Sequence, residues 1–202
     1  MASRLHLASS NRGKLRELEA LAEPAGFELG LLPDYDRLPP HPENHSSFVL
    51  NALDKALYYS QASGGLVVAD DSGLVVDALG GRPGVRSARY AGPSATDDDN
   101  NGKLLEELHG MPEEKRSARF VCALGLARQG RALAVFSDSY EGCILEAPRG
   151  RGGFGYDPIF FIPSLNRTGA ELSPQEKNRW SHRGKAFAKL LAYLRQPPLA
   201  SG

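Results

Sequence analysis

Two adjacent carboxylates, Asp70 and Asp71, directly follow the apolar run at residues 66–69 and precede Ser72 and Gly73. A continuous apolar run is typical of a parallel strand buried on both faces, and ligands of α/β enzymes collect outside the carboxyl end of such a strand. We therefore expect a strand that ends near residue 69 and a Ser-Gly turn that presents both acids. One carboxylate could bind a divalent cation while the other orients or deprotonates water. A solvated turn is the alternative interpretation.

A second polar segment, SerSerAsnArgGlyLys at residues 9–14, joins an expected strand at 5–8 to leucines at helical spacing. Backbone N–H groups, hydroxyls, the positive end of the helix and Lys14 could converge there on one anion. The segment resembles a phosphate cradle but does not match the pattern of a standard P-loop. An Asn-capped helix with a surface lysine would explain it equally well.

A glycine-rich segment at residues 149–158 holds two aromatic residues, Phe154 and Tyr156. Glycines allow the backbone to approach a ligand closely, and an aromatic ring held in such a loop can stack on a base. Further along, Lys177 and the segment at 181–185, an expected break between two helices, gather hydrogen-bond donors. The alternatives are a turn whose aromatic rings pack inward and charged helix ends in solvent.

The remaining elements form an α/β pattern. A hairpin is predicted around Gln129-Gly130, which separates two strand-like segments. Ser173 to Glu176 form a capping box with proline at the first helical position. Further strands are expected at 27–32, 141–146 and 159–162, helices at 48–62, from Thr96 to near His109 and around Phe187 to Leu194, a helix stop at Pro197-Pro198, and a crossing between regions at 80–84.

Composition narrows the functional classes. The 202 residues contain 24 Lys and Arg and 24 Asp and Glu, so the chain has no overall field for a nucleic-acid backbone or an anionic membrane. Cys122 and Cys143 lie in apolar segments without a CxxC spacing, which favours reduced structural thiols. The N-terminus lacks an apolar signal core, and no run reaches membrane-spanning length. We expect a soluble cytoplasmic protein.

Taken together and in this order, the motifs resemble the inosine triphosphate pyrophosphatase family, the non-canonical purine nucleoside-triphosphate pyrophosphatases. The resemblance spans nearly the whole chain and rests on SerSerAsnArgGlyLys, AsnAlaLeuAspLysAla, AspAspSerGlyLeu, the segment at 80–92, GlyGlyPheGlyTyrAspPro and SerHisArgGlyLys. It implies an elongated α/β fold, a mixed sheet flanked by helices, with two lobes, a central cleft and a single domain over residues 1–202. It also implies a homodimer and Mg²⁺-dependent cleavage of ITP, dITP and XTP to the monophosphate and pyrophosphate.

The resemblance assigns roles to residues as well. Asp71 is implied as catalytic base and metal ligand, and Ser72 is placed near the substrate. The implied phosphate ligands are Ser9, Ser10, Asn11, Arg12, Gly13 and Lys14, and the base is held by Phe154, Gly155, Tyr156, Asp157, Lys177, His182 and Arg183. Because Lys177, His182 and Arg183 offer donors, we expect them to favour a purine with a carbonyl at position 6.

The chain departs from the family pattern at two places. Leu50 stands where a glutamate is usual, so Glu43 is the expected second metal ligand, and Arg86 replaces a common tyrosine without a derivable effect. Two rival functions stay open. One is a nucleotide phosphatase that releases orthophosphate, and the other is a non-catalytic nucleotide-binding regulator.

Overall fold

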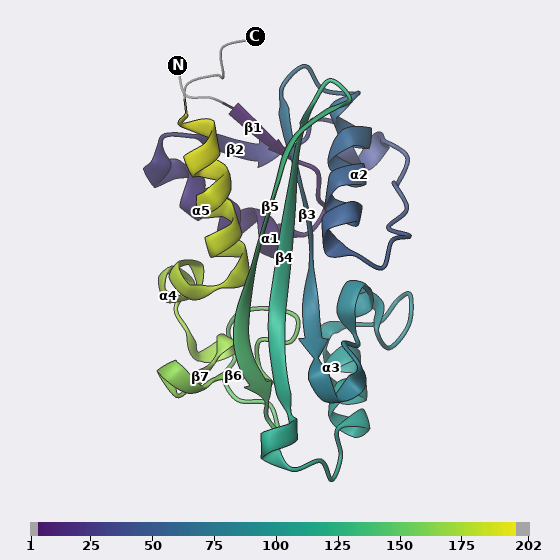
Figure 1. Cartoon of the computed structure of the whole chain (residues 1–202), viewed down its shortest axis with the longest axis vertical. Helices are drawn as coiled ribbons and strands as arrows, with labels where there is room; N and C mark the ends of the chain where they lie inside the picture. Colours follow the sequence, from purple (N-terminus) through teal and green to yellow (C-terminus); the bar gives the residue numbers. More distant parts are fainter. Residues whose placement is uncertain (1–3, 197–202) are drawn as a thin grey trace.

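The computed structural model describes residues 4–196, which form one seven-stranded mixed sheet in the order β2-β1-β3-β4-β5-β6-β7 (Figure 1). The first three strands in this order are parallel, and the other pairings are antiparallel. The strands are β1 (Arg4–Leu7), β2 (Glu28–Leu31), β3 (Leu66–Val76), β4 (Ser117–Arg128), β5 (Arg131–Ile144), β6 (Phe160–Ile162) and β7 (Arg167–Thr168). The predicted α/β class with a mixed sheet is confirmed.

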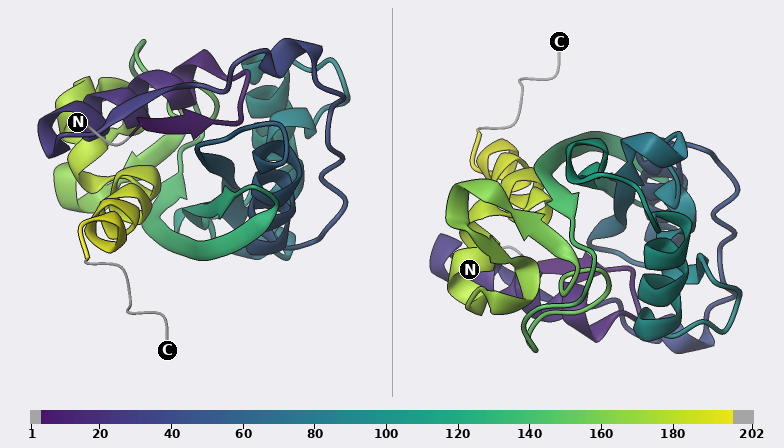
Figure 2. Two further views of the ribbon diagram at one scale, coloured as in Figure 1. Left: turned by 90° about the horizontal axis from the view of Figure 1, so that it is seen from above. Right: turned by 90° about the horizontal axis from the view of Figure 1, so that it is seen from below.

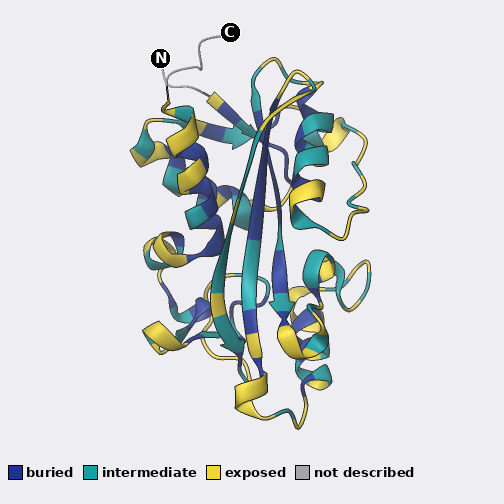
Figure 3. Cartoon of the chain, in the orientation of Figure 1, coloured by how far each residue is buried: buried dark blue, intermediate teal, exposed yellow. Residues whose placement is uncertain are grey.

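Helices cover both faces of this sheet (Figure 2). They are α1 (Arg12–Ala22), α2 (Phe48–Ser60), α3 (Asp97–Glu107), α4 (Pro174–Trp180) and α5 (His182–Leu194). Helix α2 packs on β3 and β4, while α5 packs on β4 and β5 and contacts α1. The buried residues follow the long strands and the inner helix faces (Figure 3). None of the helices in residues 4–196 is long and apolar enough to cross a membrane.

Helix starts follow the local sequence closely. Ser173 forms the predicted capping box: its hydroxyl accepts the Glu176 backbone N–H, and the Glu176 carboxylate accepts the Ser173 backbone N–H. Thr96 was expected only to cap its helix, and the structure shows a full capping box there too, with Asp99. Ser47 caps α2 in the simpler way. The last helix ends at Leu194, and the predicted stop at Pro197-Pro198 lies outside the described residues.

The prediction of a turn after Asp71 is wrong. Strand β3 continues through Ser72 and Gly73 to Val76, so the two acids lie in the middle of a long strand. A side chain at position 73 would collide with Gly84 and Ser87, because the Cβ would come within 2.5 Å of the Gly84 carbonyl oxygen. Gly73 therefore lies within the strand, and its lack of a side chain allows the 3₁₀ turn Gly84–Arg89 to pack directly against β3.

Two other local expectations need correction. The hairpin is confirmed, with Gln129 and Gly130 both at positive φ, but β5 runs on to Ile144 and leaves no separate strand at 141–146. The predicted break at residues 181–185 is a single residue, since Ser181 ends α4 and caps α5, and residues 182–185 form the first turn of α5.

Candidate active site

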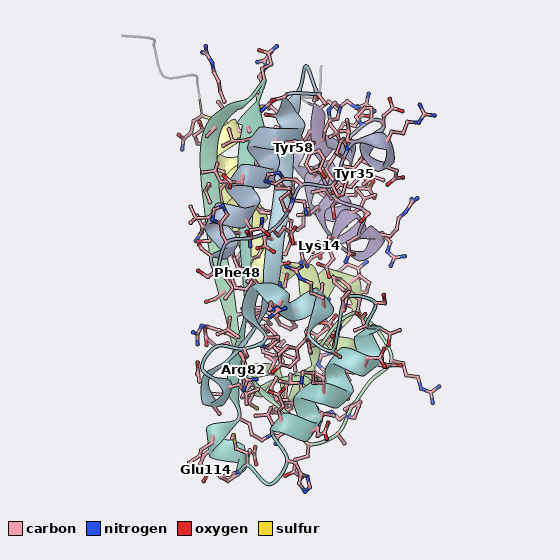
Figure 4. The ribbon with its side chains drawn as sticks, turned by 90° about the vertical axis from the view of Figure 1, so that its right-hand side faces the viewer. Lys14, Tyr35, Phe48, Tyr58, Arg82 and Glu114 are labelled. Atoms are coloured by element: carbon pink, nitrogen blue, oxygen red, sulfur yellow. The ribbon has the colours of Figure 1, made fainter. Side chains whose placement is uncertain are left out.

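A cleft of about 310 Å³ opens at the free edge of β3. Strand β1 pairs with β3 only as far as Val68, so residues beyond Val68 have β4 on one side and no β1 on the other. The acids thus lie just past the carboxyl end of β1, and not, as expected, past the end of the strand that carries them. Lys14, in the first turn of α1, lies about midway along the long axis of the molecule (Figure 4). A volume of this size suits a small-molecule ligand.

The expected phosphate cradle is partly in the cleft. Ser9, Ser10, Asn11 and Lys14 line it, whereas Arg12 and Gly13 do not. The Asn11 side chain accepts the Lys14 N–H at 3.0 Å and so caps α1, which directs the first turn of the helix at the cleft. A Cβ at position 13 would lie only 2.9 Å from the ring of Phe154, so glycine at this position leaves room for the ring.

Asp70 is a fully enclosed anion, 1% exposed. It accepts hydrogen bonds from Arg183 Nε at 2.8 Å, from the Ser72 hydroxyl at 2.8 Å and from the Cys122 thiol at 3.4 Å, and it is ion-paired with Lys14. Burial opposes its ionisation, but Arg183 and Lys14 outweigh burial and hold the pKa of Asp70 well below its usual range. Asp70 does not line the cleft and is too weak a base to take a proton.

Asp71 points to the other face of β3, because side chains alternate along a strand. It lines the cleft and accepts one hydrogen bond, from Asn51 Nδ2 to its Oδ2 at 2.9 Å. Burial raises the pKa of Asp71 to about 6, and the nearby charges of Glu43 and Asp70 add to this rise. A carboxylate with a pKa near the working pH is suited to general-base catalysis.

Glu43 shares the cleft with Asp71, and we call these two residues the acid pair. Its Oε1 accepts a hydrogen bond from Lys55 Nζ at 2.8 Å, and its Oε2 lies 3.7 Å from Arg89 Nη1. Burial raises the pKa of Glu43, but Lys55, Lys14 and Arg89 outweigh burial and lower it. Glu43 therefore stays ionised beside Asp71.

The acid pair fits a divalent cation. Mg²⁺ is usually held in proteins by one or two carboxylates together with substrate phosphate oxygens and waters. The two carboxylates line the same cleft and supply such oxygens, and the charge of Glu43 contributes to the raised pKa of Asp71. In residues 4–196 no cluster of three or more His, Cys, Asp and Glu side chains forms a complete protein-only metal site.

The glycine-rich loop forms the opposite wall. Phe154, Gly155, Tyr156 and Asp157 all line the cleft. The loop is tied at both ends of this run, since the Phe154 N–H donates to Asp157 Oδ2 at 2.8 Å and the Tyr156 hydroxyl donates to the Ser87 carbonyl at 2.8 Å. Helix α3 adds a third tie, from the Gly155 N–H to Asp97 Oδ2 at 2.6 Å. The loop is thus preorganised, with the Phe154 ring at the cleft.

Lys177 and Arg183 join this wall to helix α1 through Glu17. Both cations are ion-paired with Glu17, Lys177 also with Asp157, and Lys177 Nζ lies 4.4 Å from the centre of the Phe154 ring. The guanidinium nitrogens of Arg183 donate to Asp70, Glu17 and Ser72. We call the six charged residues Lys14, Glu17, Asp70, Asp157, Lys177 and Arg183 the charge scaffold.

The charge scaffold adds a structural task to the expected role of Arg183. One N–H of each of its three nitrogens donates to a protein group, so Arg183 holds the scaffold together, while its other two N–H groups make no hydrogen bond in the described chain and Arg183 lines the cleft. His182 is different: its ring stacks on Phe120 at 4.9 Å, its Nδ1 has no hydrogen-bond partner in the described chain, and it lines the cleft. Burial and then Arg183 hold the pKa of His182 well below its usual value, so the ring is neutral.

The sequence prediction missed several residues of the site. Glu17 and Asn51 are absent from the expected set although they contact its central members, and Lys55 and Arg89 are absent although they balance Glu43. Asn51 and Lys55 carried a signal, since they belong to the AsnAlaLeuAspLysAla motif, and Arg89 lies in the matching segment at 80–92, whereas Glu17 lies in none of the motifs. Leu50 is 48% exposed and does not line the cleft, and nothing in the structure explains Arg86, which is exposed.

Comparison with known proteins identifies the family. A family model described as the Ham1 family matches residues 5–193. A Geobacillus kaustophilus protein named dITP/XTP pyrophosphatase is 53% identical over 184 residues, which cover 91% of this chain and 90% of that protein. A HAM1 protein structure from Coxiella burnetii superposes with a TM-score of 0.84 at 42% identity, over 95% of this chain and 98% of that one. This chain belongs to the Ham1 family.

Proposed function

We propose that this protein is a nucleoside-triphosphate pyrophosphatase that hydrolyses non-canonical purine nucleoside triphosphates, ITP, dITP and XTP, to the monophosphate and pyrophosphate. The observation that carries the proposal is the division of the cleft into an acid pair on one side and a cationic, aromatic wall on the other. Relatives that share half of the sequence over most of its length are named dITP/XTP pyrophosphatases, which supports the same reaction here.

The cleft residues support a simple course of the reaction. Lys14 and the N-terminal turn of α1 bind the phosphates, since a cation and free backbone N–H groups attract an anion. Asp71 orients a water molecule and accepts its proton as the water attacks the α-phosphorus. Positioning and charge neutralisation carry most of the rate in phosphoryl transfer. Pyrophosphate then leaves as the second product.

Mg²⁺ is the proposed cofactor, held by Asp71 and Glu43. When bound, it would neutralise phosphate charge and polarise the phosphoryl oxygens. In the described chain Lys55 and Arg89 pair with Glu43. If Mg²⁺ bound Glu43, these two cations would be free to interact with the phosphates of the substrate. Lys55 and Arg89 thus offset the charge of Glu43 in the free protein, whereas Asp71 has only an amide donor.

The base is proposed to stack on Phe154, which lies beside Lys177. Lys177 and His182 line the same wall and would meet acceptors on the purine. His182 is neutral, so one of its ring nitrogens carries a proton that it can donate. A purine with a 6-carbonyl would satisfy these donors better than adenine, whose exocyclic amine would leave them unpaired.

Several finer properties stay predictions. We propose a homodimer, a cytoplasmic location, and one folded domain over residues 1–202. Size-exclusion chromatography with light scattering at micromolar concentration would give the oligomeric state. Limited proteolysis that releases a stable fragment would contradict the single domain.

The decisive experiment incubates the protein with ITP and Mg²⁺ and follows the products by phosphorus NMR. The proposal predicts inosine monophosphate and pyrophosphate, and no turnover after chelation. Orthophosphate and a diphosphate would instead identify a nucleotide phosphatase, and binding without turnover would favour a non-catalytic regulator. Parallel reactions with ATP and GTP measure selectivity.

A further inference from the structure

We propose that Asn51 is a positioning residue that fixes Asp71 and ties it to the loop that carries Glu43. The inference rests on the proposed function, because it concerns how the acid pair is held for that reaction. Asn51 lies in the buried face of α2, is 1% exposed, and does not itself line the cleft. It acts through other groups rather than on the substrate.

The amide of Asn51 makes hydrogen bonds through both of its ends. Its Nδ2 donates to Asp71 Oδ2 at 2.9 Å and to the His45 carbonyl at 3.1 Å, and its Oδ1 accepts the His45 N–H at 2.9 Å. A rotated amide would place its oxygen against a carboxylate and a carbonyl, so only one orientation is compatible with these partners. The side chain is therefore a rigid bridge between β3 and the loop.

The close approach of α2 to the sheet makes this bridge possible. A Cβ on Gly125 of β4 would come within 2.4 Å of the Ala52 carbonyl oxygen, so only glycine allows the helix to sit this near. Asp71 of β3 pairs with Ala123 of β4, and Ala123 is two residues from Gly125 along β4. At this separation a side chain as short as asparagine reaches Asp71 from the helix.

The bridge has two consequences for the acid pair. One carboxylate oxygen of Asp71 is occupied by Asn51, while Oδ1 accepts no hydrogen bond from any residue in the described chain. Asn51 also holds the loop at His45, two residues after Glu43. A single amide therefore constrains the positions of both Asp71 and the loop that carries Glu43. Without Asn51, the Asp71 carboxylate could rotate and the loop could move away from it.

Tyr59 offers a matched control. It lies on the same buried face of α2 and holds the start of the same loop, because its hydroxyl accepts the His41 N–H at 3.0 Å and donates to the Pro39 carbonyl at 3.3 Å. In the described chain it makes no hydrogen bond to Asp71, and it does not line the cleft. Tyr59→Phe thus loosens the loop without disturbing Asp71.

The test compares Asn51→Ala with Tyr59→Phe in the full-length protein. For Asn51→Ala we expect kcat for ITP to fall about 10- to 100-fold with KM changed by less than about threefold, since the lost contact orients a reacting group. We also expect the affinity for Mn²⁺, measured by electron paramagnetic resonance with a non-hydrolysable ITP analogue, to fall about tenfold. Tyr59→Phe should stay within about threefold of wild type in each measurement.

Other outcomes separate this inference from the proposed function. Equal effects of Asn51→Ala and Tyr59→Phe would overturn the inference, because the loop alone would then explain them, and so would an unchanged kcat with unchanged Mn²⁺ affinity. An inactive wild type would instead overturn the proposed function. If Asn51→Ala fails to fold, as judged by thermal unfolding, Asn51→Ser replaces it, because its hydroxyl is one bond shorter and cannot bridge both partners.

Discussion

The two faces of strand β3 treat neighbouring carboxylates in opposite ways. Asp70 is surrounded by Arg183, Lys14, a hydroxyl and a thiol, and its pKa is lowered, whereas Asp71 has one amide donor and a pKa raised to about 6. Alternation along the strand creates this difference, since it sends one acid into the charge scaffold and the other into the acid pair. A chain can thus place a permanent anion and a titratable base one residue apart.

Removal of the Asp70 charge should have the largest effect, and it should act on stability. Asp70→Asn leaves the buried Arg183 and Lys14 without their main counter-charge, so we expect the free energy of unfolding to fall by about 3–5 kcal/mol. Urea denaturation at pH 7 measures the change. The control is Asp77→Asn, which breaks an exposed pair with Arg119 and should cost less than about 1 kcal/mol. If the two variants lost the same free energy of unfolding, Asp70 would not be the central anion of the charge scaffold.

Removal of the Asp71 charge should act on turnover instead. Asp71→Asn keeps the shape of the side chain but is no base and a poor metal ligand, so we expect kcat for ITP to fall by about a hundredfold or more. Binding of a non-hydrolysable ITP analogue, measured by calorimetry, should change by less than about threefold. Near-normal turnover would move the catalytic role away from Asp71.

The same variant should be more stable than wild type at neutral pH. Since folding raises the pKa of Asp71 from 3.8 to about 6, the folded state binds this proton more tightly, and stability falls as pH rises from about 4 to 6. Asp71→Asn avoids this loss, so without metal it should gain ~1–3 kcal/mol at pH 7.5, with the gain fading towards pH 4. Thermal and urea unfolding across this range measure it, and a variant less stable than wild type at pH 7.5 would contradict the shift.

The smallest expected effect comes from Glu17, which holds Lys177 and Arg183 at the cationic wall. Glu17→Gln should raise KM for ITP about 3- to 10-fold with little change in kcat, because it loosens groups that bind the substrate rather than the acid pair. Glu19→Gln, on the same helix and outside the cleft, is the control. A fall in kcat without a change in KM would assign Glu17 to the chemical step.

Local chemistry made much of the fold predictable. The helix cap at Thr96, the capping box at Ser173 and the Gln129-Gly130 hairpin are set by neighbouring residues, so sequence alone located them. Gly73 was misinterpreted because glycine in a turn and glycine beneath a packed segment look alike in sequence, and only the approach of Gly84 and Ser87 decides between them.

The candidate site was predictable to the extent that motifs carry it. Asp71, Lys14 and Phe154 meet at one cleft as expected, although they are far apart along the chain. The partners of these residues were harder to predict. Glu17 is an ordinary helix residue until tertiary packing brings it to Arg183, and the motif that contains Asn51 does not say that its amide reaches Asp71. The different tasks of the two acids also depend on which charges surround each one.

The central claim is that Asp71, and not Asp70, is the titratable acid of this site. Carboxyl carbon NMR of the metal-free protein, labelled at aspartate and titrated from pH 4 to pH 8, tests it directly. With each signal assigned, we predict that Asp71 titrates near pH 6 and that its signal disappears in Asp71→Asn, while the Asp70 signal stays that of an ionised carboxylate throughout; burial also raises the pKa of Asp157, so the Asp157 signal is assigned separately. An Asp70 signal that titrates between pH 4 and pH 8, or an Asp71 signal that does not, would contradict the claim.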